Sequence, residues 1–140
     1  MEVWLLILQS VKMGLPFLIS HFATAIFIFV VGLWIYIWVT PMDELALIKS
    51  GNIAASLSFF GACIGIAIPL AVCLRSSVNI VDIVVWGSIA VLLQLICFKA
   101  VDVFLKNLST RIVNDEVSIA ILLVGLKISV AVLNGAAVSG

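Results

Sequence analysis

Two long stretches of this chain contain no charged side chain. Residues 13–42 and residues 50–74 lack Asp, Glu, Lys and Arg. An α-helix rises about 1.5 Å per residue, so about 20 apolar residues cross the hydrocarbon core of a bilayer. Each stretch is long enough to span a membrane. Because lipid offers no hydrogen-bond partners to backbone amides, each stretch must be helical.

The composition excludes a soluble domain. Hydrophobic residues make up 65% of the chain and charged residues only 10%, whereas a soluble domain carries about 25% charged residues. The net charge is zero, so we expect the lipid bilayer as a partner and no nucleic acid. The cysteines lie in apolar runs without further ligands at metal-binding spacing, so we expect free thiols and no metal or cofactor: Cys63, Cys73 and Cys97.

The charge pattern predicts an all-α membrane protein with a single domain over residues 1–140. Its four transmembrane helices are expected at residues 15–39, 52–74, 83–105 and 117–138. Residues Val3–Leu8 are apolar but too few to cross, so we expect an interfacial lead-in there. Lys49, Lys99, Lys106 and Arg111 gather on one side of these spans, against Lys12 and Arg75 on the other. The positive-inside rule then predicts cytoplasmic first and third loops and external termini.

The first connection, Thr40–Asn52, predicts a short interfacial helix. Thr40 would cap it, Pro41 would occupy its first turn, and the acids would meet the positive end of its dipole. We expect this segment to offer a docking surface to a cytoplasmic protein. Its candidate contact residues are Asp43, Glu44, Lys49 and Asn52.

The chain also shows signs of two repeated two-helix units. A shift of 64 positions pairs three residues at helical spacing: Gly61 with Gly125, Ile64 with Ile128, and Ala67 with Ala131. The second span further carries a stripe of small residues, which lets helix backbones approach closely. We expect helix packing there, either within the chain or between copies, at Ala54, Ser58, Gly61, Ala62 and Gly65.

Lys127 is the most unusual polar residue, because it lies near the centre of the fourth span, where a charge costs about 2.5–3.5 kcal/mol. Two interpretations stay open. Lys127 lines a cavity or pore, or meets an acid of a partner subunit; alternatively it is structural, neutral or buried against Gln94. The candidate intramembrane polar site comprises Lys127, Gln94, Asn134 and His21, although hydrogen-bonded packing explains the last three more simply.

The central part of the chain resembles the YjfL-like family, small bacterial inner-membrane proteins built on a domain of unknown function. The resemblance covers Trp38 to about Phe98. It rests on Thr40–Pro41, Glu44, Leu47–Ile48–Lys49, Gly51–Asn52, Ala54–Ala55–Ser56–Leu57, Gly61, Gly65, Pro69–Leu70, Trp86–Gly87, Ile89–Ala90 and Gln94–Leu95. It implies four spans, often as two copies of a two-helix unit, and an inner-membrane location. Gene neighbours of some relatives, PspA-like stress proteins and ATP-grasp ligases, imply a membrane-maintenance setting.

No arrangement of residues typical of catalysis occurs in the chain, so we expect no enzymatic activity. The first hypothesis is a non-enzymatic membrane component, homo-oligomeric, in a membrane-maintenance or stress setting. The alternative is a small oligomeric channel or transporter with a polar path near Lys127. A membrane enzyme is a distant third.

Overall fold

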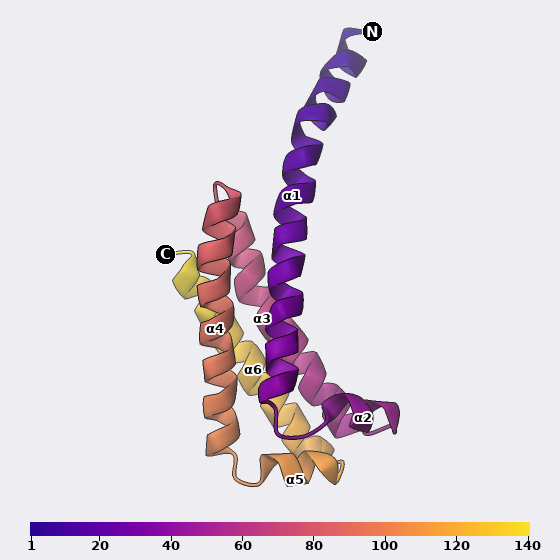
Figure 1. Cartoon of the computed structure of the whole chain (residues 1–140), viewed down its shortest axis with the longest axis vertical. Coiled ribbons are helices and arrows are strands. Elements are labelled where there is room, and N and C mark those ends of the chain that lie inside the picture. The colour runs from indigo at the N-terminus through magenta and orange to yellow at the C-terminus, as the bar shows by residue number, and fades with distance from the viewer.

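The computed structural model describes residues 1–140 and contains helices and no strands (Figure 1). The helices are α1 (Glu2–Val39), α2 (Glu44–Lys49), α3 (Ile53–Ser76), α4 (Ile80–Phe104), α5 (Leu108–Val113) and α6 (Val117–Val138). Four of them, α1, α3, α4 and α6, are long and apolar enough to cross a membrane. The predicted all-α membrane fold with a short helix between the first two spans is confirmed.

The two halves of the chain repeat the same order of a long, a short and a long helix. A shift of 64 positions moves the bounds of α2 onto those of α5, and the start of α3 onto the start of α6. The same shift pairs Gly51 with Asp115, and both have a positive φ, at 90° and 59°. The element bounds therefore repeat with the offset that the sequence pattern indicated. Both short helices lie at the same end of the bundle (Figure 1).

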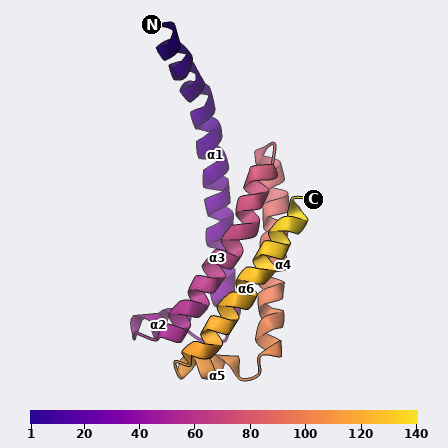
Figure 2. The ribbon, with the colours of Figure 1, turned by 180° about the vertical axis from the view of Figure 1, so that it is seen from behind.

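Helices α3 and α6 run side by side in the same direction at the centre of the molecule (Figure 2). Glycines allow this close approach, because a Cβ on Gly61 would lie 3.2 Å from the Cα of Val124. Gly65 faces α4 instead, where a Cβ would meet the Phe98 ring at 2.6 Å. The structure buries the whole small-residue stripe within the chain, including Ala54, Ser58 and Ala62.

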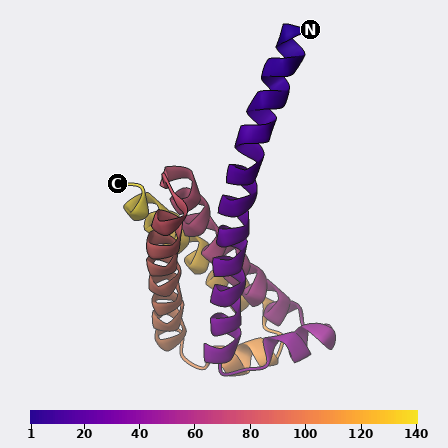
Figure 3. The same cartoon turned by 45° about the horizontal axis from the view of Figure 1, so that its top comes forward.

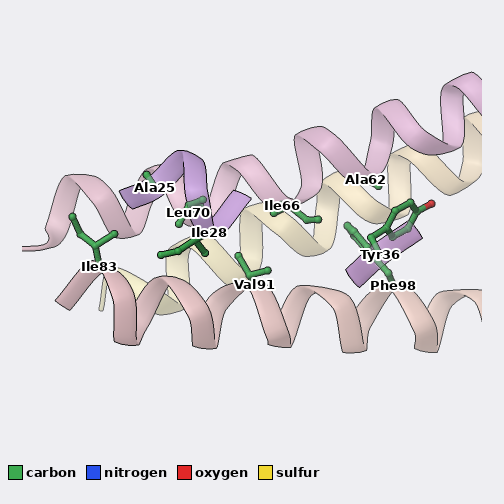
Figure 4. Packing of buried hydrophobic residues seen from close by; sticks show 9 residues of the cluster. All are labelled: Ala25, Ile28, Tyr36, Ala62, Ile66, Leu70, Ile83, Val91 and Phe98. Atoms are coloured by element: carbon green, nitrogen blue, oxygen red, sulfur yellow. The ribbon is translucent and has the colours of Figure 1, made fainter. Parts of the chain in front are cut away.

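Apolar side chains fill the spaces between helices in two clusters. The larger one joins α1, α3 and α4 (Figure 4) and consists of Ala25, Ile28, Tyr36, Ala62, Ile66, Leu70, Ile83, Val91 and Phe98. The smaller one lies where α5 meets α3 and α6, and consists of Ala54, Ala55, Leu108, Ile112, Ile119, Ala120 and Leu123. Each half of the chain contributes to both clusters, so neither half packs alone.

Helix α1 differs from its prediction. A separate lead-in at Val3–Leu8 is wrong, because one helix continues from Glu2 through Pro16 to Val39. Its 38 residues correspond to about 57 Å, well beyond the ~30 Å of the hydrocarbon core. Only its second half packs on the bundle, through His21, Ala25, Ile28, Gly32 and Tyr36. The first half extends away from the other helices (Figures 1 and 3).

Side-chain caps fix the N-terminal ends of α2, α3 and α4. Helix α4 begins three residues before its predicted start, because the Asn79 side chain accepts a hydrogen bond from the backbone N–H of Asp82 at 2.9 Å. The first short helix begins later than predicted. Thr40 ends α1 by donating to the Tyr36 carbonyl, and Asp43 rather than Thr40 caps α2, accepting from Ala46 N at 3.0 Å.

Candidate functional site

Lys127 lies in the centre of the bundle with 1% of its surface exposed. Its Nζ donates to the Tyr36 hydroxyl at 2.9 Å, and to the Ser58 carbonyl and hydroxyl at 3.1 and 3.2 Å. An ammonium has three hydrogens, and each finds an acceptor here. The same nitrogen lies 4.7 Å from the centre of the Tyr36 ring and 5.2 Å from that of Phe98, where the π-faces favour a cation. The charge is therefore solvated by the protein itself.

Glu44 supplies the opposite charge from α2. Its Oε1 accepts hydrogen bonds from the Ser58 hydroxyl at 2.6 Å and from the Tyr36 hydroxyl at 3.0 Å. Each hydroxyl thus accepts from the ammonium of Lys127 and donates to the carboxylate of Glu44. We call these four residues, Tyr36, Glu44, Ser58 and Lys127, the bridged ion pair. Two hydroxyl bridges relay the interaction between charges that do not touch directly.

The environment of Glu44 is nevertheless incomplete. Its side chain is 1% exposed, and Oε2 has no hydrogen-bond partner. Burial raises the pKa of this carboxyl group above its ordinary value, although the Ser58 hydroxyl and the charge of Lys127 act in the opposite direction. Water does not reach this carboxylate, so its charge is stabilised by the hydroxyls of Ser58 and Tyr36 and by Lys127. Removing either partner should therefore affect the whole bundle.

A second polar chain links Lys127 to the opposite end of the bundle. The Gln94 amide donates to the Lys127 carbonyl at 3.2 Å. Asn134 donates to the Gln94 side-chain oxygen at 3.1 Å and to the Ala90 carbonyl at 2.9 Å. These bonds join α4 to α6, and interhelical amide contacts of this kind hold membrane helices in register.

His21 does not join the other predicted polar residues. Its ring packs on Phe17 with 3.6 Å between centroids, and its Nδ1 lies 2.9 Å from the Phe17 carbonyl. No hydrogen bond connects it to Lys127, Gln94 or Asn134. The structure thus brings three of the four candidate residues together and leaves His21 as a separate contact within α1.

The predicted docking segment needs a correction. Asp43 and Lys49 are exposed, but Glu44 and Asn52 are buried, at 1% and 8% exposure. Glu44 turns inward because Lys127 and the two hydroxyls compensate its charge there. Asn52 caps α3 through Ala55 N at 2.6 Å and donates to the Ile112 carbonyl at 2.9 Å. Neither buried side chain is available to a docking protein.

The two connections at this end also cap each other. While Asn52 satisfies carbonyls at the end of α5, Asp115 accepts from the backbone N–H of Ala54 at 2.7 Å, at the start of α3. Helix termini leave such groups without intrahelical partners. Each half of the chain therefore supplies a cap that the other half needs.

Three members of the bridged ion pair were not predicted for this site. Glu44 was assigned to the docking segment. Tyr36 was not singled out, and Ser58 was assigned to helix packing alone. One signal was available for Tyr36, since it is the single tyrosine of the chain and interrupts an otherwise apolar run. Buried tyrosine hydroxyls usually have a hydrogen-bond partner. No group of three or more His, Cys, Asp or Glu side chains comes together as metal ligands.

Comparison with known proteins gives a consistent result. The family model described as Domain of Unknown Function (DUF350) matches residues 10–138. The chain is 37% identical to the UPF0719 inner membrane protein YjfL of Escherichia coli strain K12 over 97 residues, which cover 69% of this chain and 74% of the relative. The protein of the same name in Escherichia coli O157:H7 matches equally. No solved structure matches the chain.

The match and the four apolar helices together identify a multi-pass protein of the inner membrane. The matched family region, residues 10–138, contains all four members of the bridged ion pair and both reciprocal caps. The chain belongs to the DUF350 family and is similar to the inner-membrane protein YjfL.

Proposed function

We propose that this protein is a non-enzymatic structural component of the inner membrane that assembles into a homo-oligomer and acts in membrane maintenance. The observation that carries the proposal is that the two buried charges, those of Lys127 and Glu44, are paired with each other within the chain. All hydrogens of the Lys127 ammonium are donated within the chain, and the carboxylate of Glu44 is bridged to it. Such a pair ties helices together and leaves no free charge for chemistry on a substrate.

The outer face of α6 supports assembly between copies. Gly125 and Ser129 are exposed four residues apart, and nothing lies within 4 Å of a Cβ on Gly125. Their counterparts in the first half, Gly61 and Gly65, are packed inside the chain. Small residues at this spacing favour close helix contacts in membranes. The same feature is thus used within the chain in one half and is unpartnered in the other.

The proposed orientation places α2 and α5 in the cytoplasm and both termini outside. Lys49, Lys99, Lys106 and Arg111 lie at or near the end that carries the short helices, against two bases elsewhere outside the core. A cavity of about 610 Å³ lies there between α2 and α5, lined by Asp43 and Thr110 among others. We propose that a cytoplasmic protein docks beside it, with Asp43 and Lys49 as exposed charged contacts.

Oligomeric state in lipid nanodiscs tests the assembly. Native mass spectrometry should find an oligomer for the wild type, and Gly125→Leu with Ser129→Leu should shift it toward monomer. Leu126→Ile, a neighbouring exposed change, is the matched control. A wild-type monomer at all protein concentrations would overturn the proposal.

Docking is tested by reversing the exposed charges alone. The double variant Asp43→Lys, Lys49→Glu should no longer capture the cytoplasmic protein in a pull-down, while its insertion into the membrane is unchanged. Glu44 must be left intact, because its reversal would disrupt the bridged ion pair. Retained capture would contradict docking at this segment.

A second candidate function, a small oligomeric channel or transporter, is favoured by two cavities at the ends of the polar chain. One, of about 20 Å³ and large enough for about one water, is lined by Tyr36, Lys99 and Asp102. The other, of about 650 Å³, is lined by Asn134. Between them lie Lys127 and Gln94.

Flux across liposomes decides between the two candidates. A channel requires flux of some ion or solute above that of empty vesicles, with loss or altered selectivity in Lys127→Leu. Flux equal to that of empty vesicles, for several ions and solutes, would exclude the channel and support the structural role. Leu133→Ile on the exposed face of the same helix controls for reconstitution.

A further inference from the structure

Two adjoining cavities open at the end of the bundle opposite the short helices. The larger, of about 650 Å³, lies among α3, α4 and α6, and its lining includes Asp82, Trp86 and Asn134. The smaller, of about 330 Å³, lies between α3 and α6, and its lining includes Arg75. Ser76 and Ser139 line both, so the two volumes share a wall. Figures 1 and 2 show the α3–α4 connection and the C-terminus at this end.

Asn134 lines the larger cavity and has an acceptor without a hydrogen-bond partner. Its Nδ2 donates to two acceptors, the Ala90 carbonyl and the Gln94 side-chain oxygen, and this fixes which way the amide faces. The residue is only 5% exposed, and its Oδ1 has no hydrogen-bond partner. A buried acceptor without a donor is costly, so a ligand N–H here would be stabilising.

The larger cavity contains a negatively charged side chain, and the smaller cavity contains a positively charged one. Asp82 adds a carboxylate to the larger cavity, where its Oδ2 receives only one long hydrogen bond, from Val78 N at 3.4 Å. Trp86 adds an aromatic surface that attracts cations. Arg75 adds a guanidinium to the smaller cavity and has no acidic partner, since the molecule's single salt bridge joins Arg111 and Glu116.

The position of the cavities indicates a lipid. Helix α3 ends at Ser76 and α4 begins at Ile80, so the site lies where transmembrane helices leave the hydrocarbon core. Trp86 lies within two turns of this end, at a depth where membrane tryptophans concentrate. Deeper along α4, Ile89 and Leu93 line the larger cavity and are also exposed on the outer surface. They provide an apolar path for an acyl chain.

We propose that these cavities bind the headgroup of a zwitterionic phospholipid that carries a primary ammonium, as in phosphatidylethanolamine. The ammonium enters the larger cavity, where it donates to Asn134 Oδ1 and to the Asp82 carboxylate beside Trp86. The phosphate is held by Arg75 and by the hydroxyls of Ser76 and Ser139. The site does not depend on the assembly or docking proposed above.

The chemistry discriminates among phospholipids. Phosphatidylcholine has a cation without N–H donors, so it cannot satisfy Asn134 Oδ1. Phosphatidylglycerol has the phosphate but no cation for Asp82. The expected preference for the primary ammonium is roughly tenfold, the size of a single weak hydrogen bond to a charged group.

The experiment titrates the delipidated full chain in detergent with each of the three lipids and counts bound lipid by native mass spectrometry. Phosphatidylethanolamine should bind about tenfold more tightly than the other two. Asp82→Asn should remove most of the preference over phosphatidylglycerol, and Arg75→Gln should weaken the binding of all three lipids. Lys106→Gln, an exposed change at the opposite end, should change nothing. Asn134 is left unchanged, because its bonds to α4 contribute to folding.

Each outcome decides the proposal. Equal binding of the three lipids, or a preference over phosphatidylglycerol that survives Asp82→Asn, overturns it. Soluble O-phosphoethanolamine is the second arm, and its competition with bound phosphatidylethanolamine supports headgroup recognition. If O-phosphoethanolamine binds and phosphatidylethanolamine does not, the ligand is a soluble compound and the proposal of a membrane lipid is wrong. Circular dichroism of each variant checks that the helices are retained.

Discussion

The two halves of this protein share one backbone plan but differ in chemistry. The 64-residue offset that aligns their helices places Glu44 opposite Leu108, and both are buried. It places Lys127 opposite Cys63, and Tyr36 opposite Ala100. Three members of the bridged ion pair thus come from the first half and one from the second. The repeat supplies the architecture, while differences at equivalent positions supply the interaction that ties the halves together.

The largest effect is expected from removing one charge of the bridged ion pair. Lys127→Leu should destabilise the protein by about 3–5 kcal/mol, because Glu44 then remains buried without a counter-charge. Adding Glu44→Leu, which gives this position the residue of its counterpart Leu108, should restore most of the loss. Unfolding in detergent, followed by circular dichroism, measures both variants. A double variant no more stable than Lys127→Leu would contradict the pairing.

Equivalent glycines should respond in opposite directions. Gly61→Ala adds a Cβ 3.2 Å from the Val124 backbone, and we expect it to destabilise the chain by about 1–3 kcal/mol through overpacking. Gly125→Ala meets nothing within 4 Å and should be neutral or stabilise by up to about 1 kcal/mol through helix propensity. The same unfolding assay on monomeric protein compares them. Equal losses would show that the halves pack alike.

The reciprocal caps should contribute comparable amounts. Asn52→Ala removes a cap of α3 and the bonds to α5, and Asp115→Ala removes the acceptor for Ala54 N. We expect about 1–2 kcal/mol of destabilisation from each. Hydrogen exchange at the first turn of α3 should increase in both variants. Unchanged exchange in Asp115→Ala would mean that the halves do not cap each other.

The smallest effect is expected from pH. Because the pKa of Glu44 is raised in the folded state, its stabilising contribution is fully present below the ordinary value near 4.5. That contribution is lost as pH rises through the raised value. Wild type should therefore lose stability relative to Glu44→Gln over this window, by less than about 1.4 kcal/mol per pH unit. If the stability of the wild type and of Glu44→Gln changed with pH in the same way, this prediction would be wrong.

Local features were predictable, and contacts across the bundle were not. The interfacial helix between the first two spans was predicted, but its cap was misplaced by three residues because Thr40 and Asp43 are both good N-cap types. Glu44 was assigned to the docking segment, because the positive end of the helix dipole favours an acid at a helix start. Its true partner, Lys127, lies 83 positions away, and no local pattern connects the two.

The sequence by itself determined the membrane fold, the number of spans and the 64-residue repeat. The fold and the spans follow from the solvent, because lipid requires long charge-free helices and short polar connections wherever the chain crosses it. The repeat follows from residues that match 64 positions apart. Only the tertiary structure decided which polar groups meet. The crossing of α3 and α6 and the rotation of each helix about its axis bring Tyr36, Ser58 and Glu44 around Lys127. A hydrogen bond needs its atoms within about 3 Å, and hydropathy along a chain does not specify position at that scale.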